Sequence, residues 1–115
     1  MRLKGAILTG AVALGSCLAA SAGVLVEAEA FAERGGWVID TQFADIMGSP
    51  YLLAHGKGVP VQDAVTTVTL PSSGTWRLWV RTRDWTPDFA GEKPGRFEIA
   101  LNGVTLPTIF GIEPA

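Results

Sequence analysis

The stretch Pro71–Asp84, PSSGTWRLWVRTRD, decides the fold expected for this chain, because a tight turn opens there into one long two-sided β-strand. From Trp76 the side chains alternate between two faces. One face carries Trp76, Leu78, Val80 and Thr82, and the other carries Arg77, Trp79, Arg81 and Arg83. The first face is typical of a core-facing surface. A tryptophan among three arginines is unusual for a plain solvated face, so the second face is the first candidate for a functional surface.

Shorter strands are expected on both sides of this stretch. Alternating or β-branched runs predict strands at 24–31, 37–41, 51–54, 63–70 and 95–102. The side chains expected to face inward include Val68, Leu70, Phe97, Ile99 and Leu101. Asn102-Gly103 is a strong hairpin signal that leads into 104–106, and one helical turn is expected at 43–47.

Many short strands, regular turn signals and no long helix predict an all-β fold, an antiparallel β-sandwich of the jelly-roll type. The run after residue 106 is apolar, is broken by glycine and proline, and closes no sheet edge. We therefore expect residues 23–115 to be an incomplete sandwich domain, the N-terminal piece of a longer protein.

The first 22 residues have the pattern of an export signal. Arg2 and Lys4 form a basic start, an apolar stretch follows, and Ala20-Ser21-Ala22 is a small-residue cleavage site. The apolar stretch is too short for a transmembrane span. A competing interpretation takes 14–17, Leu-Gly-Ser-Cys, as a lipoprotein signal in which Cys17 is lipidated. We favour cleavage after Ala22, and both interpretations predict an exported protein.

Charge and cysteine content narrow the function classes. Removing residues 1–22 takes away two cations and no acid, so the net charge changes from −2 to −4. A negative domain is a poor partner for nucleic acid or an anionic membrane surface. Cys17 is the only cysteine, so the processed chain has neither a disulfide nor thiolate chemistry.

Three segments resemble the landmarks of family 6 and family 35 carbohydrate-binding modules, which are galactose-binding-like jelly rolls. These segments are 26–31 (VEAEAF), 70–76 (LPSSGTW) with Val80-Arg81, and 99–103 (IALNG). Three others, 35–40 (GGWVID), 47–56 (MGSPYLLAHG) and 80–85 (VRTRDW), resemble the sandwich domain attached to secreted bacterial FAD-dependent oxidoreductases and xanthan-lyase-type proteins. The second resemblance is the more specific, and it implies an accessory domain of a polysaccharide-associated enzyme.

The chain lacks the glycine-rich turn by which flavin-binding proteins hold their dinucleotide. A dinucleotide site needs a glycine-rich turn between a strand and a helix. Gly56-Lys57-Gly58 is followed by Val-Pro-Val, with neither a further glycine nor a helix. We therefore expect no FAD site in this chain.

Glu27 and Glu29 are candidate metal ligands. At positions i and i+2 of a strand both carboxylates project from one face, where a hard cation such as Ca²⁺ relieves their repulsion. The resemblance to family 6 and 35 modules implies a structural calcium at these acids. Those modules complete the site with a carboxylate near the C-terminus, and we expect no such ligand in this chain. The alternative, two acids on a solvated edge strand, stays open.

Sugar binding needs an aromatic face and polar groups near it. The candidates are Trp79 with Arg77, Arg81 and Arg83, together with Trp37, Tyr51 and Trp85. For Trp79 we favour packing against a further element, of which docking to a catalytic domain is one form. Trp76 is expected in the core.

The sequence offers no convincing catalytic group. His55 is the only histidine, and it is expected in a loop, with no carboxylate next to it in the sequence. The leading hypothesis is a non-catalytic, carbohydrate-binding-like accessory domain of a secreted polysaccharide-associated FAD-dependent oxidoreductase. The partner is then a polysaccharide or a C-terminal catalytic domain. The alternatives are a structural docking domain and a truncated piece of the oxidoreductase.

Overall fold

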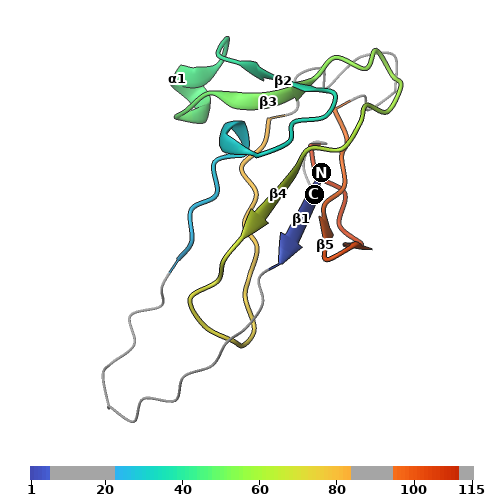
Figure 1. The fold of residues 1–115 in the computed structure, drawn as a ribbon. Helices are drawn as coiled ribbons and strands as arrows, with labels where there is room; N and C mark the ends of the chain where they lie inside the picture. Colours follow the sequence, from blue (N-terminus) through green and yellow to red (C-terminus); the bar gives the residue numbers. More distant parts are fainter. Residues whose placement is uncertain (6–22, 84–94, 112–115) are drawn as a thin grey trace.

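The computed structural model describes residues 1–5, 23–83 and 95–111, and these consist mainly of strands and coil (Figure 1). The strands are β1 (Arg2–Gly5), β2 (Trp37–Asp40), β3 (Tyr51–Ala54), β4 (Val65–Val68), β5 (Ala100–Leu101) and β6 (Val104–Thr105). A 3-10 turn, η1, spans Ala28–Ala30, and one short helix, α1, spans Ala44–Met47. The described chain therefore has all-β character.

The strands form two small sheets. The larger has the order β4-β1-β5-β6, and the smaller is the antiparallel pair β2-β3. β1 lies parallel to both β4 and β5, whereas β5 and β6 form an antiparallel hairpin. This arrangement is all-β without being two packed sheets, so the sandwich itself stays a prediction.

The hairpin at Asn102-Gly103 is confirmed. Asn102 has φ 51° and Gly103 has φ 82°, the pair of positive values that a type I′ turn requires. Ala100 pairs with Thr105 and Leu101 with Val104 across the turn. Asparagine and glycine tolerate this backbone conformation better than other residues, which is why the local sequence specifies the turn.

Several other local predictions are also confirmed. The strand expected at 37–41 is present as β2, the run 51–54 is β3, and β4 lies inside the predicted 63–70. The helical turn expected at 43–47 is α1. It ends at Gly48, whose φ of 85° and N–H bond to the Ala44 carbonyl (2.7 Å) form a left-handed cap.

The expected strand at 24–31 is wrong. Residues 24–27 form no strand, and 28–30 turn into η1. Alanine and glutamate favour strands weakly, so little opposes the turn. Phe31 is only 5% exposed and packs into the core immediately after it.

The predicted strand from Trp76 onward is also absent, because residues 75–83 have no ladder partner in the described chain. The alternation of faces is nevertheless visible in part. Trp76 and Val80 are half-buried, whereas Trp79 is 81% exposed. The pattern therefore predicted two unequal faces, while strand pairing depended on a neighbour that the described chain does not place there.

The core is small. Its apolar residues are Phe31, Ala64, Ile99 and Ala100, each no more than 5% exposed. Ile99 is buried as predicted, but Leu70 and Leu101 are each 38% exposed, so the expectation that they face inward is wrong. Both lie where no further layer covers them in the described chain.

Aromatic rings join the two sheets. Phe97 and Phe110 exchange two backbone hydrogen bonds of 2.9 Å, and their rings stack at 5.6 Å. Trp37, at the start of β2, meets Phe97 edge-on at 5.9 Å. Edge-on and stacked contacts of this kind add to the area that the rings bury, so they fix the β2-β3 pair against the C-terminal segments.

Candidate functional site

The candidate site lies on residues 76–83, the Arg/Trp segment, and on the part of the β2-β3 region that this segment contacts. The Arg77 guanidinium lies over the Trp79 ring, 5.8 Å from its centroid. Trp79 exposes 81% of its surface. One ring face is therefore covered by a cation, and an exposed tryptophan of this kind offers its other face for stacking.

Trp76 lies on the opposite side of the same segment. It is half-buried, and its indole N–H donates to the Ser72 carbonyl at 3.1 Å. This bond closes the Pro71–Gly74 turn onto the start of the segment and satisfies the donor that a packed indole carries. Trp76 is thus oriented by the turn that the sequence signalled, although it is only partly buried.

Arg81 binds the end of α1. Its Nη2 donates to the Ile46 carbonyl at 2.9 Å. A Cβ at Gly48 would lie 3.0 Å from Arg81 Nη1, so the glycine leaves room for the guanidinium as well as capping the helix. The last carbonyls of a helix lack intrahelical partners, and a nearby arginine satisfies one of them.

Arg83 lies over the ring of Phe43, with its guanidinium carbon 4.3 Å from the ring centroid. Phe43 precedes α1, so Arg81 and Arg83 hold the same turn from two points. Because these two arginines are two residues apart in an extended segment, they project to one side, and α1 receives both.

Tyr51 completes this cluster through its hydroxyl. The hydroxyl donates to Asp40 Oδ2 in a short hydrogen bond and accepts from the Phe43 N–H at 3.2 Å. Partial burial, followed by the bond to Asp40, raises the pKa of Tyr51 above 10.0, and the nearby Arg83 acts in the opposite direction. The hydroxyl therefore stays protonated and serves as a fixed link between β2 and β3.

The predicted site residues thus fall into separate groups. The structure brings Arg81, Arg83 and Tyr51 together around α1, and it pairs Arg77 with Trp79. Trp37 belongs to the aromatic cluster with Phe97 and borders a shallow hollow of about 480 Å³ that Arg34 also lines. Trp85 lies outside the described residues.

Asp40 and Phe43 belong to the α1 cluster although the sequence did not single them out. Asp40 could have been found from the pairing of β2 with β3, because Asp40 lies opposite Tyr51 in this antiparallel pair. Once 37–41 and 51–54 are paired as neighbouring strands, their side chains fall opposite each other. Phe43 carries no comparable signal, because its role depends on where Arg83 lies.

The guanidiniums of the Arg/Trp segment contact uncharged groups in the described chain. Within residues 1–5, 23–83 and 95–111, no ion pair joins Arg77, Arg81 or Arg83 to a carboxylate. Arg81 and Arg83 are instead held by a carbonyl and a ring, which do not neutralise them. The segment therefore presents positive charge on an otherwise acidic chain.

The predicted metal ligands are not arranged as the strand model required. Glu27 precedes η1 and is exposed, while Glu29 lies within that turn and is half-buried. Residues at i and i+2 share a face on a strand but not in a tight helical turn. In the part of the chain that is described, no three His, Cys, Asp or Glu side chains lie close enough to hold a metal. Calcium binding by this pair stays a prediction.

Two further findings bear on the class of protein. Among the described residues no helix is long and apolar enough to cross a membrane. Comparison of the chain with protein-family models, with curated proteins and with solved structures gave no match.

Proposed function

We propose that this chain is a non-catalytic, carbohydrate-binding-like accessory domain of an exported protein. The observation that supports this most directly is Trp79, an 81% exposed indole with Arg77 over one face. The uncovered ring face suits the C–H side of a pyranose, and the arginines of the same segment can donate to its hydroxyl groups.

The parent protein in this proposal is a secreted, polysaccharide-associated FAD-dependent oxidoreductase. Its support is the sequence resemblance of segments 35–40, 47–56 and 80–85 to domains attached to such enzymes. The flavin and the chemistry belong to the parent enzyme, and this chain contributes binding or attachment. Calcium held by Glu27 and Glu29 is part of the same proposal.

Isothermal titration of the purified protein against acidic and neutral plant and bacterial polysaccharides, with and without calcium, tests the proposal. Saturable heat that falls on Trp79→Ala supports it. Leu78→Ala is the matched control, because Leu78 is the next residue back, faces the other side and is itself 42% exposed. No heat with any glycan from a folded protein contradicts it.

A second function, docking to a catalytic domain, has an observation of its own. Leu78 and Trp79 point to opposite sides of one extended segment, and both are exposed. A segment that has no ladder partner among the described residues and that carries apolar groups on both faces is suited to being covered by another domain. Two results together distinguish this role. The protein binds a separately produced catalytic domain and loses that binding on Trp79→Ala, and it binds no glycan.

A further inference from the structure

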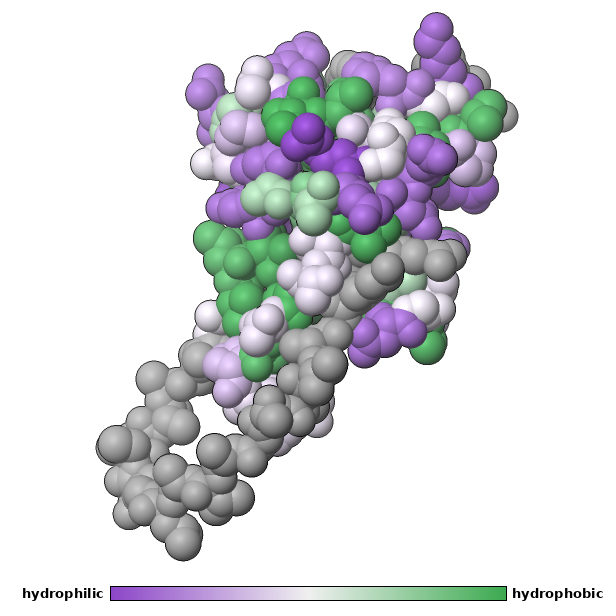
Figure 2. Space-filling model, in the orientation of Figure 1, coloured by the Kyte–Doolittle hydropathy of each residue, from purple (hydrophilic) through white to green (hydrophobic). Residues whose placement is uncertain are grey.

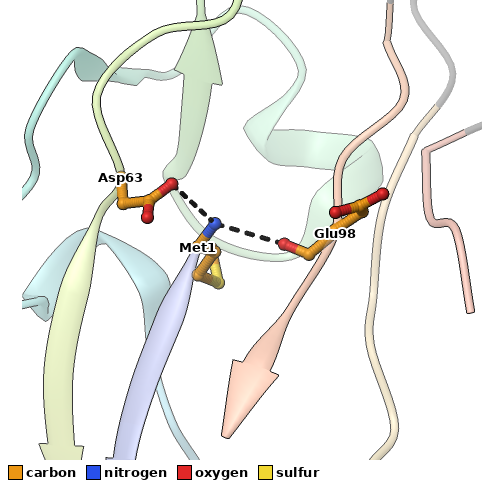
Figure 3. A network of polar contacts seen from close by, with 3 residues as sticks. All are labelled: Met1, Asp63 and Glu98. Carbon is orange, nitrogen blue, oxygen red and sulfur yellow. Dashed lines mark hydrogen bonds and ion pairs between the residues drawn. The ribbon is translucent and has the colours of Figure 1, made fainter. Parts of the chain in front are cut away.

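The N-terminus of the chain fills a gap in the larger sheet. β1 lies between β4 and β5, parallel to both, with Arg2 in register with Val65 and Ala100. The Met1 carbonyl accepts from the Ala100 N–H at 2.9 Å. The Met1 ammonium donates to the Glu98 carbonyl at 3.1 Å and lies 3.7 Å from Asp63 Oδ1 (Figure 3).

This strand belongs to the segment that the sequence predicts to be removed on export. Loss of residues 1–22 takes β1 out of the sheet and leaves the facing backbone groups of β4 and β5 without their ladder partners. An unpaired strand edge is a template for pairing, and Ala64 and Ala100, which are almost fully buried with β1 in place, become exposed apolar surface when it leaves. A replacement strand in the gap would pair these edges and cover that surface.

The new N-terminus matches the strand it would replace. It reads Gly-Val-Leu-Val-Glu from Gly23, against Met-Arg-Leu-Lys-Gly from Met1. Both begin with an α-ammonium group and carry leucine in third place. The two valines favour a strand more than the arginine and lysine that they replace.

Residues 24–27 are also available to move. Val24, Leu25 and Val26 are 37%, 83% and 40% exposed, and they border a hollow of about 290 Å³ beside Thr66–Thr69. Figure 2 shows hydrophobic side chains gathered on this flank of the molecule. The segment thus leaves apolar surface in water while lying next to β4.

The chain is long enough for the exchange. Phe31 is buried and Glu33 pairs with Val65 on the edge of β4 away from β1, so the chain is anchored there. A segment ending with Glu27 in the gap must cross two strand spacings, about 10 Å, to reach that anchor. The chain must pass over β4 rather than through it, and the six residues from Glu27 to Glu33 span up to about 20 Å when extended, which covers this detour.

We propose that, once residues 1–22 are removed, Gly23–Glu27 takes the place of β1 between β4 and β5. The Gly23 ammonium then occupies the position of the Met1 ammonium, at the Glu98 carbonyl and Asp63. The leader occupies the gap in the unprocessed chain, and processing exchanges one N-terminal strand for another. The inference rests on cleavage after Ala22, which N-terminal sequencing of the exported protein tests separately; a different N-terminus overturns it.

A disulfide test reports the new strand directly. In the proposed register Val24 pairs with Ala100, so Val24→Cys with Ala100→Cys should oxidise to an intramolecular disulfide in the processed protein, which has no other cysteine. Leu25→Cys with Ala100→Cys is the matched control, because side chains one residue apart point to opposite faces. We expect closure at least about tenfold faster than in the control, since disulfide formation depends steeply on Cβ separation and direction. Equal rates overturn the proposal.

The unprocessed chain, carrying Cys17→Ser, should behave in the opposite way. There Arg2→Cys with Ala100→Cys should close, and Val24→Cys with Ala100→Cys should not. Closure of the second pair with the leader in place would mean that the gap is not the site of exchange.

Hydrogen exchange provides a measurement without cysteines. The amides that face β1, those of Thr66, Val68 and Ala100, should be similarly protected in the chain that begins at Gly23 and in the unprocessed chain. In a chain that begins at Ala28 they should exchange about tenfold faster or more, because the strand hydrogen bonds are gone. Unchanged protection in that shortest chain overturns the proposal.

Discussion

Replacing Gly35 with alanine should destabilise the protein through a single added methyl group. Gly35 has φ +54°, and a Cβ there would lie 2.3 Å from the Asp63 carbonyl oxygen and 2.6 Å from that of Gln62. Both neighbours are backbone atoms, and the adjacent Gly36 N–H donates to the Gln62 carbonyl at 3.0 Å. The clash therefore cannot be relieved by rotating a side chain.

The expected loss has two parts. The left-handed conformation costs an alanine about 1 kcal/mol, and shifting packed backbone costs a further 1–3 kcal/mol or so. The free energy of unfolding should therefore fall by about 2–4 kcal/mol. With a urea slope of about 1–2 kcal/mol per M, the unfolding midpoint should fall by about 1–4 M.

Gly58→Ala is the matched control for this measurement. Gly58 has φ +85°, but nothing lies within 4 Å of the position that its Cβ would take. It should lose only the conformational part, about 1 kcal/mol. Equal losses in the two variants at unchanged slope would refute the contact between Gly35 and the 62–63 backbone.

Two other predictions follow from the aromatic residues. Trp37→Ala should lower the free energy of unfolding by about 2–3 kcal/mol, because a half-buried indole and its edge contact with Phe97 are lost. Trp79→Ala should lower the free energy of unfolding by less than about 1 kcal/mol, since an exposed cation–π contact contributes little. Denaturant unfolding of both variants measures the two losses, and a larger loss for Trp79→Ala than for Trp37→Ala would contradict this prediction. The raised pKa of Tyr51 makes the folded state hold its proton more tightly, so stability is full below pH 10 and falls as the pH rises through the folded value. Tyr51 is the only tyrosine, so its near-ultraviolet absorbance reports the titration, and Tyr51→Phe should abolish that part of the pH dependence.

Much of the local structure could be predicted from residue types alone. The Asn102-Gly103 turn and the helical turn before Gly48 depend on contacts within a few residues, and the β-rich runs at β2 and β3 were visible as candidate strands. Their backbone preferences decide the outcome before any tertiary contact forms. The candidate residues of the Arg/Trp segment were also visible, because an alternating pattern shows which side chains share a face.

The grouping of those residues could not be predicted. Arg83 meets Phe43 and Arg81 meets Ile46 across 40 and 35 positions of sequence, and no local pattern encodes such separations. The same limit explains the two failed strands. A strand exists only when another segment offers it backbone partners, and the described chain offers none to 75–83.

The sequence by itself determined the all-β character, the turns and the alternation around Trp79, because each depends on residue type and short-range order. Only the tertiary structure decided that β1 fills the gap between β4 and β5 and that Arg81, Arg83 and Tyr51 meet around α1. Both outcomes depend on which segments, far apart in the sequence, form backbone hydrogen bonds and arginine contacts with each other. These contacts exist only when the whole chain is folded.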